Sequence, residues 1–556
     1  MKPRGIAWSI VGVLSLCAAA RAQVQYESAK LTASDAAKAA YFGASLGISG
    51  NIAVVGAPGD AEGAPGAGAA YMFRCHGANW VQEQKLVASD AHQSDAFGGA
   101  VAISGDTVMV TAPGADTFYP NDGAVYVFQF NGMAWVQTQI LLASDANDAH
   151  YFGTSVALEK DVAVIGQVGD SFAGASESGT IYVFRRRGTP WVEEQKLSPP
   201  DLGLFDHFST SVSLSGNVIV GGAPQNDLRG AAYIFRWNGT HWVQAQKLTA
   251  SDGAQDDLYG HSVAVDEGVA VIGAFQHGGA FASSGSAYVY RYSGVTWGDE
   301  QILNPPTEVT GGEFGWSVSV LADQLLVGAI GAGASDPPSG AGYLYHLESG
   351  AWVQRAELVG SNAILLGAAV ALQAGYAVVG DVASDDACPG QPLCDSGSAY
   401  VYVLQDCNGN GIADQCDIAS GISADCNSNG IPDDCDIANC GGDPGCTDCN
   451  GNGIPDGCEP DCNGNGIPDD CDDVPCPPIL GACCNHDPFI ACADGLSRAE
   501  CSCTRCEWTQ DVLCADVECP RDSIPTLDAW GLVVLALLLI TGAKVRFGSV
   551  RRNQAT

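Results

Sequence analysis

Positive charge is scarce in this chain. Only 24 Lys and Arg stand against 63 Asp and Glu, which gives a formal net charge of -39. From Ala356 through Ser497 there is no Lys or Arg. A surface this acidic repels nucleic acid and anionic lipid, whereas it favours solubility and the capture of cations. We therefore expect no nucleic-acid partner.

Cysteine is absent from most of the chain. After Cys17, Cys75 is the one cysteine before Cys388, and the remainder lie in the last third. Residues 1–22 are typical of a secretory signal peptide, with a basic start, an apolar run and small residues around a cleavage site. Removing Cys17 leaves an even number of cysteines. The pattern predicts disulfides formed in an oxidising compartment.

Helical periodicity is missing from residues 23–405, where an aromatic-glycine pair recurs every 51 to 56 residues instead. The pair stands at Phe42-Gly43, Phe97-Gly98, Phe152-Gly153, Phe208-Ser209, Tyr259-Gly260, Phe314-Gly315 and, in degenerate form, Leu366-Gly367. Each period holds four short apolar segments, which read SVAI, AVVGAP, AYVF and WVQEQKL in typical form. Such a period predicts the blades of a β-propeller.

The residue types of the repeat suit this fold. The second and third segments are apolar at nearly every position, as expected for strands buried on both faces between neighbouring blades. The glycine after each aromatic residue permits close backbone approach or a positive φ. We expect the tryptophan that opens each fourth segment to pack between blades rather than to stack on a ligand.

The ends of the repeat region predict how the ring closes. Fourth segments begin at Trp80, Trp135, Trp191, Trp242, Trp297 and Trp352, and the seventh unit stops at Leu404 without one. The missing segment is found at the other end, because YESAKL (Tyr26 to Leu31) aligns with WVQEQKL. The sequence therefore predicts an all-β, seven-bladed propeller over residues 23–405, closed by the N-terminal strand so that no sheet edge is exposed.

The FG and GAP words at this interval resemble the FG-GAP repeat of integrin α-chain propellers and their secreted bacterial relatives. Many members of that family carry a Dx[DN]xDG cation loop before the GAP strand. Here that position holds a bare turn, such as SGN at 49–51 or SGD at 104–106. The resemblance implies the propeller fold, and the sequence gives no support for calcium inside the ring.

Strand order predicts which face of the ring binds a partner. Connections between blades and connections from the second to the third strand emerge on one side. They hold the longest insertions and the Asp-rich turns (Asp35, Asp90, Asp95, Asp145, Asp148, Asp252, Asp256 and Asp257). Variable loops on a rigid scaffold often carry function, so we expect an unknown protein or glycan ligand there. The alternative is that these aspartates cap turns and solvate the rim.

Residues 406–473 contain four twelve-residue loops: DCNGNGIADQCD, DCNSNGIPDDCD, DCNGNGIPDGCE and DCNGNGIPDDCD. Oxygen-bearing residues at positions 1, 3, 5, 9 and 12, a carbonyl at 7 and glycine at 6 form the order in which a loop wraps Ca²⁺. The expected ligands are Asp406, Asn408, Asn410, Ile412, Asp414, Asp417, Asp425, Asn427, Asn429, Ile431, Asp433, Asp436, Asp448, Asn450, Asn452, Ile454, Asp456, Glu459, Asp461, Asn463, Asn465, Ile467, Asp469 and Asp472.

Flanking helices of the EF-hand kind are not expected, because only Pro460 separates the third loop from the fourth. The segment resembles thrombospondin type 3 repeats, in which a nearly coreless chain wraps calcium and is held by disulfides. Cysteine at positions 2 and 11 of each loop departs from that family and leaves the pairing open. Asn at positions 3 and 5 lowers the ligand charge, so weak binding of roughly 0.1 to 1 mM is expected.

Residues 474–520 form a second cysteine-dense segment. Nine cysteines predict a small disulfide-stapled module, and the cluster Cys501, Cys503 and Cys506 leaves zinc as the alternative. The odd count requires a partner outside the module, for which Cys440, Cys446 and Cys75 are candidates. Cys388 and Cys394 are expected to pair within the last long propeller loop.

Residues 521–556 have three parts: an IPTL word at Ile524 to Leu527, an apolar run to Ala543 and a basic end. The layout resembles the IPTL-CTERM sorting signal of Gram-negative bacteria. The resemblance implies a sorting protease and an address at the cell surface or outer envelope. The apolar run of about 15 residues predicts a hydrophobic helix and is short of the roughly 20 that span a bilayer. A plain C-terminal membrane anchor is the alternative.

These features favour a non-enzymatic, secreted or surface-anchored binding or adhesion protein that presents a propeller on a calcium-stabilised stalk. An extracellular hydrolase and a purely structural envelope protein are the alternatives. No HExxH motif occurs, and the nine His are scattered over different blades. The formal GxSxG at 43–47 lies on a repeat strand, where related positions read GGAVA and GTSVA, so we expect Ser45 to be a repeat residue and not a nucleophile.

Overall fold

The computed structural model describes residues 23–170, 177–278, 281–333, 339–386, 394–427, 430–439, 446–449, 453–459, 468, 480–485, 493–497 and 506–510. The chain divides into two compact units, Met1–Ala438 and Asn439–Thr556. The predicted leader at 1–22 and the predicted sorting tail at 521–556 lie outside the described residues.

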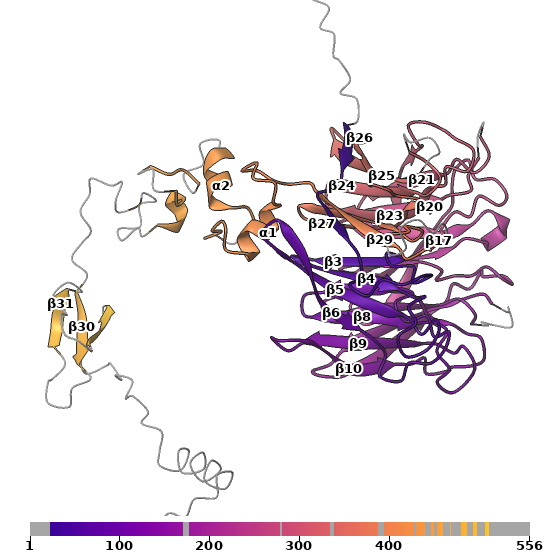
Figure 1. Cartoon of the computed structure of the whole chain (residues 1–556), viewed down its shortest axis with the longest axis horizontal. Helices are drawn as coiled ribbons and strands as arrows, with labels where there is room; N and C mark the ends of the chain where they lie inside the picture. The colour runs from indigo at the N-terminus through magenta and orange to yellow at the C-terminus, as the bar shows by residue number, and fades with distance from the viewer. Residues whose placement is uncertain are drawn as a thin grey trace, which may run out of the picture. The chain divides into compact units, whose positions relative to one another are not determined.

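The first unit contains the predicted seven-bladed propeller (Figure 1). Blades 1 to 4, each given from its first strand to its fourth, are β3 (Ser45–Ser49), β4 (Ile52–Ala57), β5 (Ala69–His76), β6 (Asn79–Leu86); β7 (Val101–Ser104), β8 (Thr107–Ala112), β9 (Ala124–Phe130), β10 (Trp135–Leu141); β11 (Phe152–Glu159), β12 (Val162–Gln167), β13 (Thr180–Arg186), β14 (Trp191–Leu197); and β15 (Val212–Ser215), β16 (Val218–Ala223), β17 (Ala231–Trp237), β18 (Trp242–Leu248). A short 3-10 turn, η1 (Asn226–Leu228), precedes β17.

Blades 5 to 7 complete the ring. Their strands are β19 (Ser262–Asp266), β20 (Val269–Ala274), β21 (Ser286–Tyr292), β22 (Trp297–Leu303); β23 (Phe314–Leu321), β24 (Gln324–Ala329), β25 (Ala341–Glu348), β26 (Ala351–Val359); and β27 (Leu366–Gln373), β28 (Tyr376–Asp381), β29 (Ser398–Val403), β2 (Ala29–Leu31). The first strands of all seven blades line one central cavity of about 490 Å³.

Closure by the N-terminal segment is confirmed, with one difference from the prediction. β2 pairs antiparallel with β29 and is the fourth strand of blade 7. Tyr26 does not belong to this strand. Residues 27–28 interrupt the strand structure, and Gln23–Tyr26 forms a separate strand, β1. β1 pairs in parallel with β26 and adds a fifth strand to blade 6. The N-terminus therefore ties two neighbouring blades together.

The core lies between the blades, as the uninterrupted apolar segments predicted. β4 and its counterparts β8, β16, β20, β24 and β28 are buried at every position. One cluster joins Val54 and Met72 of blade 1 to Val110 and Trp135 of blade 2. Trp135 is only 3% exposed, and Trp191, Trp242, Trp297 and Trp352 are buried in the same way. The structural role predicted for these tryptophans is confirmed.

A glycine before each third strand explains how closely the blades approach. Gly68 forms a parallel bridge with Phe97 of the next blade, and a Cβ atom on Gly68 would lie 2.1 Å from the Phe97 carbonyl oxygen. The contact recurs around the ring and includes Gly397 with Phe42, where the two ends of the propeller meet. A side chain at this glycine would separate neighbouring blades.

The remaining described elements follow the propeller. Two short helices, α1 (Asp414–Ala419) and α2 (Asp433–Asn439), and a 3-10 turn, η2 (Asp456–Cys458), lie in the predicted calcium loops. In the second unit, β30 (Leu480–Asn485), β31 (Ala493–Ser497) and β32 (Cys506–Gln510) form a three-stranded antiparallel sheet in the predicted cysteine-rich module. Among the described residues no helix has the length and apolarity needed to cross a membrane. The apolar run that ends at Ala543 lies outside them.

Candidate functional site

Two regions carry the predicted function: one face of the propeller and the calcium loops. We define the loop face as the connections between successive blades, 32–44, 87–100, 142–151, 198–211, 249–261, 304–313 and 360–365, together with the described parts of the connections from second to third strands. The two kinds of connection lie side by side, because backbone hydrogen bonds join them. Ala96 N donates to Gly66 O, and Tyr151 N donates to Asn121 O.

The first aspartate of each Asp-rich turn braces the next blade. A tyrosine hydroxyl from a third strand donates to each of them, in the pairs Tyr71 with Asp35, Tyr126 with Asp90, Tyr182 with Asp145, Tyr233 with Asp201 and Tyr288 with Asp252. In blade 1 the Lys85 ammonium also lies 2.6 Å from Asp35. Burial alone would raise the pKa of Asp35, but the hydrogen bonds from Lys85 and Tyr71 outweigh it and hold that pKa below its usual value.

The second aspartate of these turns holds the turn itself. Asp95 is 2% exposed and accepts the His92 backbone N–H. Asp257 accepts from Ala254 N and lies 2.9 Å from His277 Nδ1. The hydrogen-bonded aspartates therefore fit the alternative role, in which they hold the turns of the rim. Asp148 and Asp256 are exposed instead.

Large apolar side chains remain exposed on the loop face. They are Tyr41, Phe118, Tyr119, Tyr151, Leu204, Phe205, Leu228, Phe281 and Ile364, with exposed fractions between 39% and 74%. On the opposite turns, which join first to second and third to fourth strands, Met133 and Val295 are the large apolar residues exposed among those described. Exposed aromatic side chains are typical of binding surfaces.

The central cavity offers little chemistry by comparison. Its two carboxylates, Glu159 and Asp266, are engaged: Gly216 N donates to Glu159, and Ser215 Oγ and Ala322 N donate to Asp266. Ser45, the serine of the formal GxSxG, donates to Gly98 O of the next blade. This inter-blade bond recurs at other first strands, for example from Ser155 and Ser262. Ser45 is therefore a repeat residue, as predicted.

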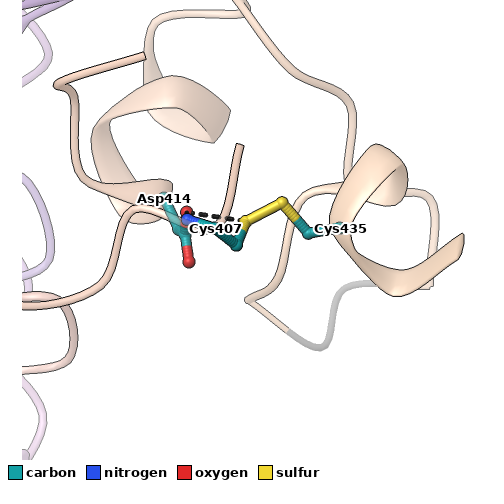
Figure 2. Close-up of side chains that lie close together, drawn as sticks. All are labelled: Cys407, Asp414 and Cys435. Atoms are coloured by element: carbon teal, nitrogen blue, oxygen red, sulfur yellow. Dashed lines mark hydrogen bonds between the residues drawn. A yellow bond between two sulfur atoms is a disulfide. The ribbon is translucent and has the colours of Figure 1, made fainter. Parts of the chain in front are cut away.

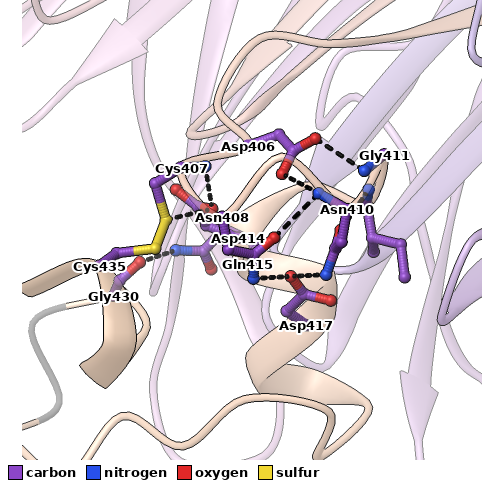
Figure 3. Close-up of a disulfide and its surroundings, with 11 residues drawn as sticks. Asp406, Cys407, Asn408, Asn410, Gly411, Asp414, Gln415, Asp417, Gly430 and Cys435 are labelled. Carbon is purple, nitrogen blue, oxygen red and sulfur yellow. Dashed lines mark hydrogen bonds between the residues drawn. A yellow bond between two sulfur atoms is a disulfide. The ribbon is translucent and has the colours of Figure 1, made fainter. Parts of the chain in front are cut away.

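The first predicted calcium loop, residues 406–417, folds around its own polar groups (Figure 3). The Asp406 carboxylate accepts the backbone N–H groups of Asn410 and Gly411. The side-chain amides of Asn408 and Asn410 both donate to Asp417 Oδ2, at 3.1 and 2.8 Å. Positions 1, 3, 5 and 12 of the loop are thus brought together.

Two hydrogen bonds repeat in the first three loops. The position-1 carboxylate accepts the N–H of the glycine at position 6, at 2.8, 3.0 and 2.9 Å. The position-9 carboxylate accepts the N–H of the cysteine at position 2, at 3.0, 2.9 and 2.9 Å. The glycines at position 6 all have φ of +84°, which explains why this position is glycine.

The remaining predicted ligands are described only in part. In the second loop, Asn427 donates to Asp436 Oδ2 at 2.8 Å, and Ile431 is exposed. In the third, Asp448, Ile454, Asp456 and Glu459 are described. Outside the described residues lie Asn429, Asn450, Asn452, Asp461, Asn463, Asn465, Ile467, Asp469 and Asp472.

We expected no flanking helices, and this prediction is wrong for the first two loops, because each of them ends in a short helix. α1 begins at Asp414 and α2 at Asp433, which are position 9 of the first and second loops. Pro460 excludes a longer helix only after the third loop, where η2 is a single turn. The first and second loops therefore have a loop-then-helix arrangement, with the position-12 residues Asp417 and Asp436 on the helices.

Two disulfides resolve part of the open cysteine pairing. Cys407, at position 2 of the first loop, pairs with Cys435, at position 11 of the second (Figure 2). Asp414 lies beside this bridge, but sulfurs in a disulfide are not thiolate ligands, so this group is not a metal site. Cys416, at position 11 of the first loop, pairs with Cys75 of the propeller. Cys75 is thus not the missing partner of the 474–520 module.

The first loop is docked on the propeller at the junction of blades 1 and 7. Ala413 and Cys416 are fully buried in a core cluster that contains Phe73 and Tyr376. Gly77 N, in the turn after β5, donates to Ser420 Oγ at 2.9 Å. This turn and the one that precedes Tyr376 belong to the face opposite the loop face. The chain therefore leaves the propeller on the side away from the candidate binding surface.

The residues of the first loop suit a calcium ion. Asp417 is 0% exposed, and its Oδ1 atom has no hydrogen-bond partner. Burial raises the pKa of Asp414, and the nearby carboxylates Asp406 and Asp417 raise it further. No basic side chain is available in this stretch of sequence. A buried, partnerless carboxylate oxygen beside two further carboxylates is an environment that a hard cation would stabilise.

Sequence reasoning missed three structural devices: the Cys75–Cys416 bridge, the strand β1 and the glutamine contacts between blades. In the last of these, Gln84 accepts from Trp135 N and donates to Trp135 O, both at 2.8 Å. The fifth letter of WVQEQKL does the same at Gln139, Gln195, Gln246 and Gln301. The sequence did carry a signal for this contact, because the glutamine recurs in five units and is replaced by Ala356 in blade 6.

Comparison with known families agrees with this architecture. The FG-GAP repeat model matches residues 26–73, 80–128, 135–184, 191–235, 242–290 and 297–345, which together cover more than half of the chain. The IPTL-CTERM motif model matches residues 522–543. No curated protein matches the chain. An FG-GAP propeller with this sorting motif indicates an extracellular or cell-surface protein. The chain belongs to the FG-GAP repeat family.

Proposed function

We propose that this protein is a secreted or surface-anchored binding protein without catalytic activity, which recognises a protein or glycan through the loop face. The observation that carries this proposal is the set of exposed aromatic and aliphatic side chains there, among them Phe118, Tyr119 and Phe205. The rigid ring beneath them supports binding at low entropic cost, because its loops are already joined by backbone hydrogen bonds. The family and the sorting motif support a surface location.

Binding is tested with the mature chain against arrayed bacterial surface glycans and envelope proteins. The variant Phe118→Ala, Tyr119→Ala, Phe205→Ala should weaken any specific interaction at least tenfold, as expected when anchoring aromatics are removed. The control Met133→Ala, Val295→Ala removes apolar side chains from the opposite turns and should bind like the wild type. Equal losses in both variants would contradict the proposal. Absence of any ligand would favour a purely structural envelope role.

The same proposal gives the loops at 406–473 a calcium-binding role. Asp406, Asn408, Asn410, Asp417 and the Ile412 carbonyl would hold the ion in the first loop, and their counterparts would do so in the others. Calorimetry on the mature chain should show saturable heat with Ca²⁺ at roughly 0.1 to 1 mM. Absence of heat would refute this part of the proposal without affecting the binding role of the loop face.

The C-terminal segment is proposed to direct sorting. The IPTL-CTERM match supports processing by a sorting protease in a Gram-negative-type bacterium, with the protein held at the membrane or outer envelope through its tail. Intact-mass analysis of the protein recovered from the cell surface tests this. A mass that lacks the residues after the IPTL word supports cleavage, and the full-length mass supports a retained anchor.

A further inference from the structure

The first calcium loop differs from the others in its place in the molecule. Its helix α1 carries Cys416, which is fully buried and bonded to Cys75 of blade 1. Ala413, one residue before the helix, is buried against the core of blades 7 and 1. Residues 413–420 therefore cover the junction at which the propeller closes, and they belong to the ring rather than to a stalk.

The cation ligands of this loop are coupled to the same helix. Asp417 follows Cys416 directly, and its carboxylate is fully buried with the Oδ1 atom unpartnered. Asp436, the equivalent residue in the second loop, is half-buried. In the first loop, a buried carboxylate with one unpartnered oxygen thus lies next to the disulfide that holds the closing blades.

We propose that calcium in the first loop clamps the propeller closure, so that the cation controls how often the junction of blades 7 and 1 opens. The inference rests on the proposed calcium binding. A bound ion would give Asp417 Oδ1 the positively charged partner that it lacks, and it would hold Asp406 and Asp417 together. Opening α1 away from Gly77 and the blade core, with the bridge to Cys75 still in place, would disrupt these ligands, so calcium stabilises the closed junction by mass action.

The Cys75–Cys416 bridge provides a local measure of opening. Cys75 is 1% exposed and Cys416 is 0% exposed, so dithiothreitol reaches the bridge only when the packing of α1 against the blades opens. With a dissociation constant of roughly 0.1 to 1 mM, 5 mM Ca²⁺ should slow reduction of this bridge about 6- to 50-fold relative to chelator. Thiol labelling and mass spectrometry of the peptide that contains Cys75 give the rate in the intact mature protein.

Two variants locate the effect. Asp417→Asn should remove the calcium dependence of the reduction rate, whereas Asp436→Asn, in the second loop, should retain it. If Asp417→Asn does not fold, Asp406→Asn serves in its place. The inference is overturned if calorimetry shows calcium binding but the wild-type rate is equal in calcium and chelator, or if Asp436→Asn abolishes the dependence while Asp417→Asn keeps it. Absence of calcium heat would instead refute the proposed calcium binding itself.

Discussion

The blade junctions of this propeller are of two kinds. Five of them, from blade 1/2 to blade 5/6, carry the glutamine that binds both backbone polar groups of the next tryptophan, as Gln246 does with Trp297. Junctions 6/7 and 7/1 lack it. Ala356 takes the place of the glutamine in blade 6 and pairs with Gln23 of β1, and a disulfide holds blade 1 to α1.

The difference reflects chain connectivity. At an ordinary junction each of the two blades is one continuous segment of sequence, so a few hydrogen bonds suffice to align them. Blade 7 is assembled from segments at both ends of the propeller, and the loop that must close is correspondingly long, which raises its entropic cost. Two further strands and a covalent bond supply the extra stabilisation there. Changes made at each kind of junction test this difference.

Deleting residues 23–31 should have the largest effect. It removes β1 and β2 and exposes the edges of blades 6 and 7. It also removes the Leu31 side chain from the core. We expect loss of cooperative unfolding and concentration-dependent aggregation, measured by calorimetry and light scattering. Deleting residues 23–26 alone, which spares β2, should leave a monomeric but less stable ring. A fully stable monomer after the longer deletion would refute closure by β2.

Removing the bridge with Cys75→Ser and Cys416→Ser should come next. The bonded residues are 341 positions apart, and loss of a disulfide that closes a long loop typically costs about 3 to 5 kcal/mol. Denaturant unfolding under oxidising conditions measures the loss. Replacing Cys407 and Cys435, which are only 28 positions apart, is the matched control and should affect propeller unfolding much less.

Lys196→Ile should destabilise an ordinary junction by about 2 kcal/mol at neutral pH, because it leaves the nearly buried Asp170 without its cation. The ammonium of Lys196 lies 2.5 Å from Asp145 and 2.6 Å from Asp170. Isoleucine occupies this position naturally at Ile140 and Ile302. Lys38→Ile, at an exposed lysine outside the strands, is the control and should change stability little.

The Lys196 contribution should depend on pH. Burial alone would raise the pKa of Asp145, but hydrogen bonds from Lys196 and Tyr182 hold that pKa below its usual value. A depressed carboxylate pKa stabilises the fold above the unfolded value of about 4 and loses this effect as pH falls further. Urea midpoints of wild type and Lys196→Ile should therefore converge at about pH 3. A constant gap would contradict the assignment.

Gln246→Ala should cost about 1 to 2 kcal/mol, since two partly buried hydrogen bonds to Trp297 are lost. Gln244→Ala, on the same strand but with an exposed side chain, provides a control of identical chemistry. Denaturant midpoints that shift equally in both variants would show that the glutamine contact adds nothing to blade alignment.

The smallest effect is expected from a feature that both kinds of junction share. Ala96 at junction 1/2 and Ala39 at junction 7/1 have φ of +55° and +58°, in the left-handed region that side chains disfavour. Replacing either with glycine should stabilise the protein by about 0.5 to 1 kcal/mol. Thermal unfolding measures the gain. Destabilisation at both sites would mean that the backbone is relaxed there.

Much of the architecture could be predicted because the repeat makes one physical argument several times over. The period, the buried second strands and the absent seventh WVQEQKL all follow from residues near one another in sequence. The order of oxygen-bearing residues in the predicted calcium loops was likewise readable. The helices α1 and α2 were not, because six or seven residues starting at an aspartate carry no clear helical period.

What escaped prediction depends on contacts between distant segments. Cys75 was conspicuous as the only propeller cysteine before Cys388, but nothing local to it distinguishes Cys416 from the other candidates. β1 could not be recognised because residues 23–25 match no repeat position, Tyr26 aligns with the repeat instead, and the parallel partner of β1 is more than half the chain away. The roles of Asp35 and Asp145 were ambiguous until their tyrosine and lysine partners were located.

The pairing of β2 with β29 sets an order for biogenesis. Ser28 and Val403, which meet across this pair, are 375 residues apart. In a chain that emerges N-terminus first, β2 therefore has no partner until β29 has emerged. Blades 1 to 5 can form before that point, whereas closure of the ring and oxidation of Cys75 with Cys416 must wait until the chain has emerged beyond Cys416.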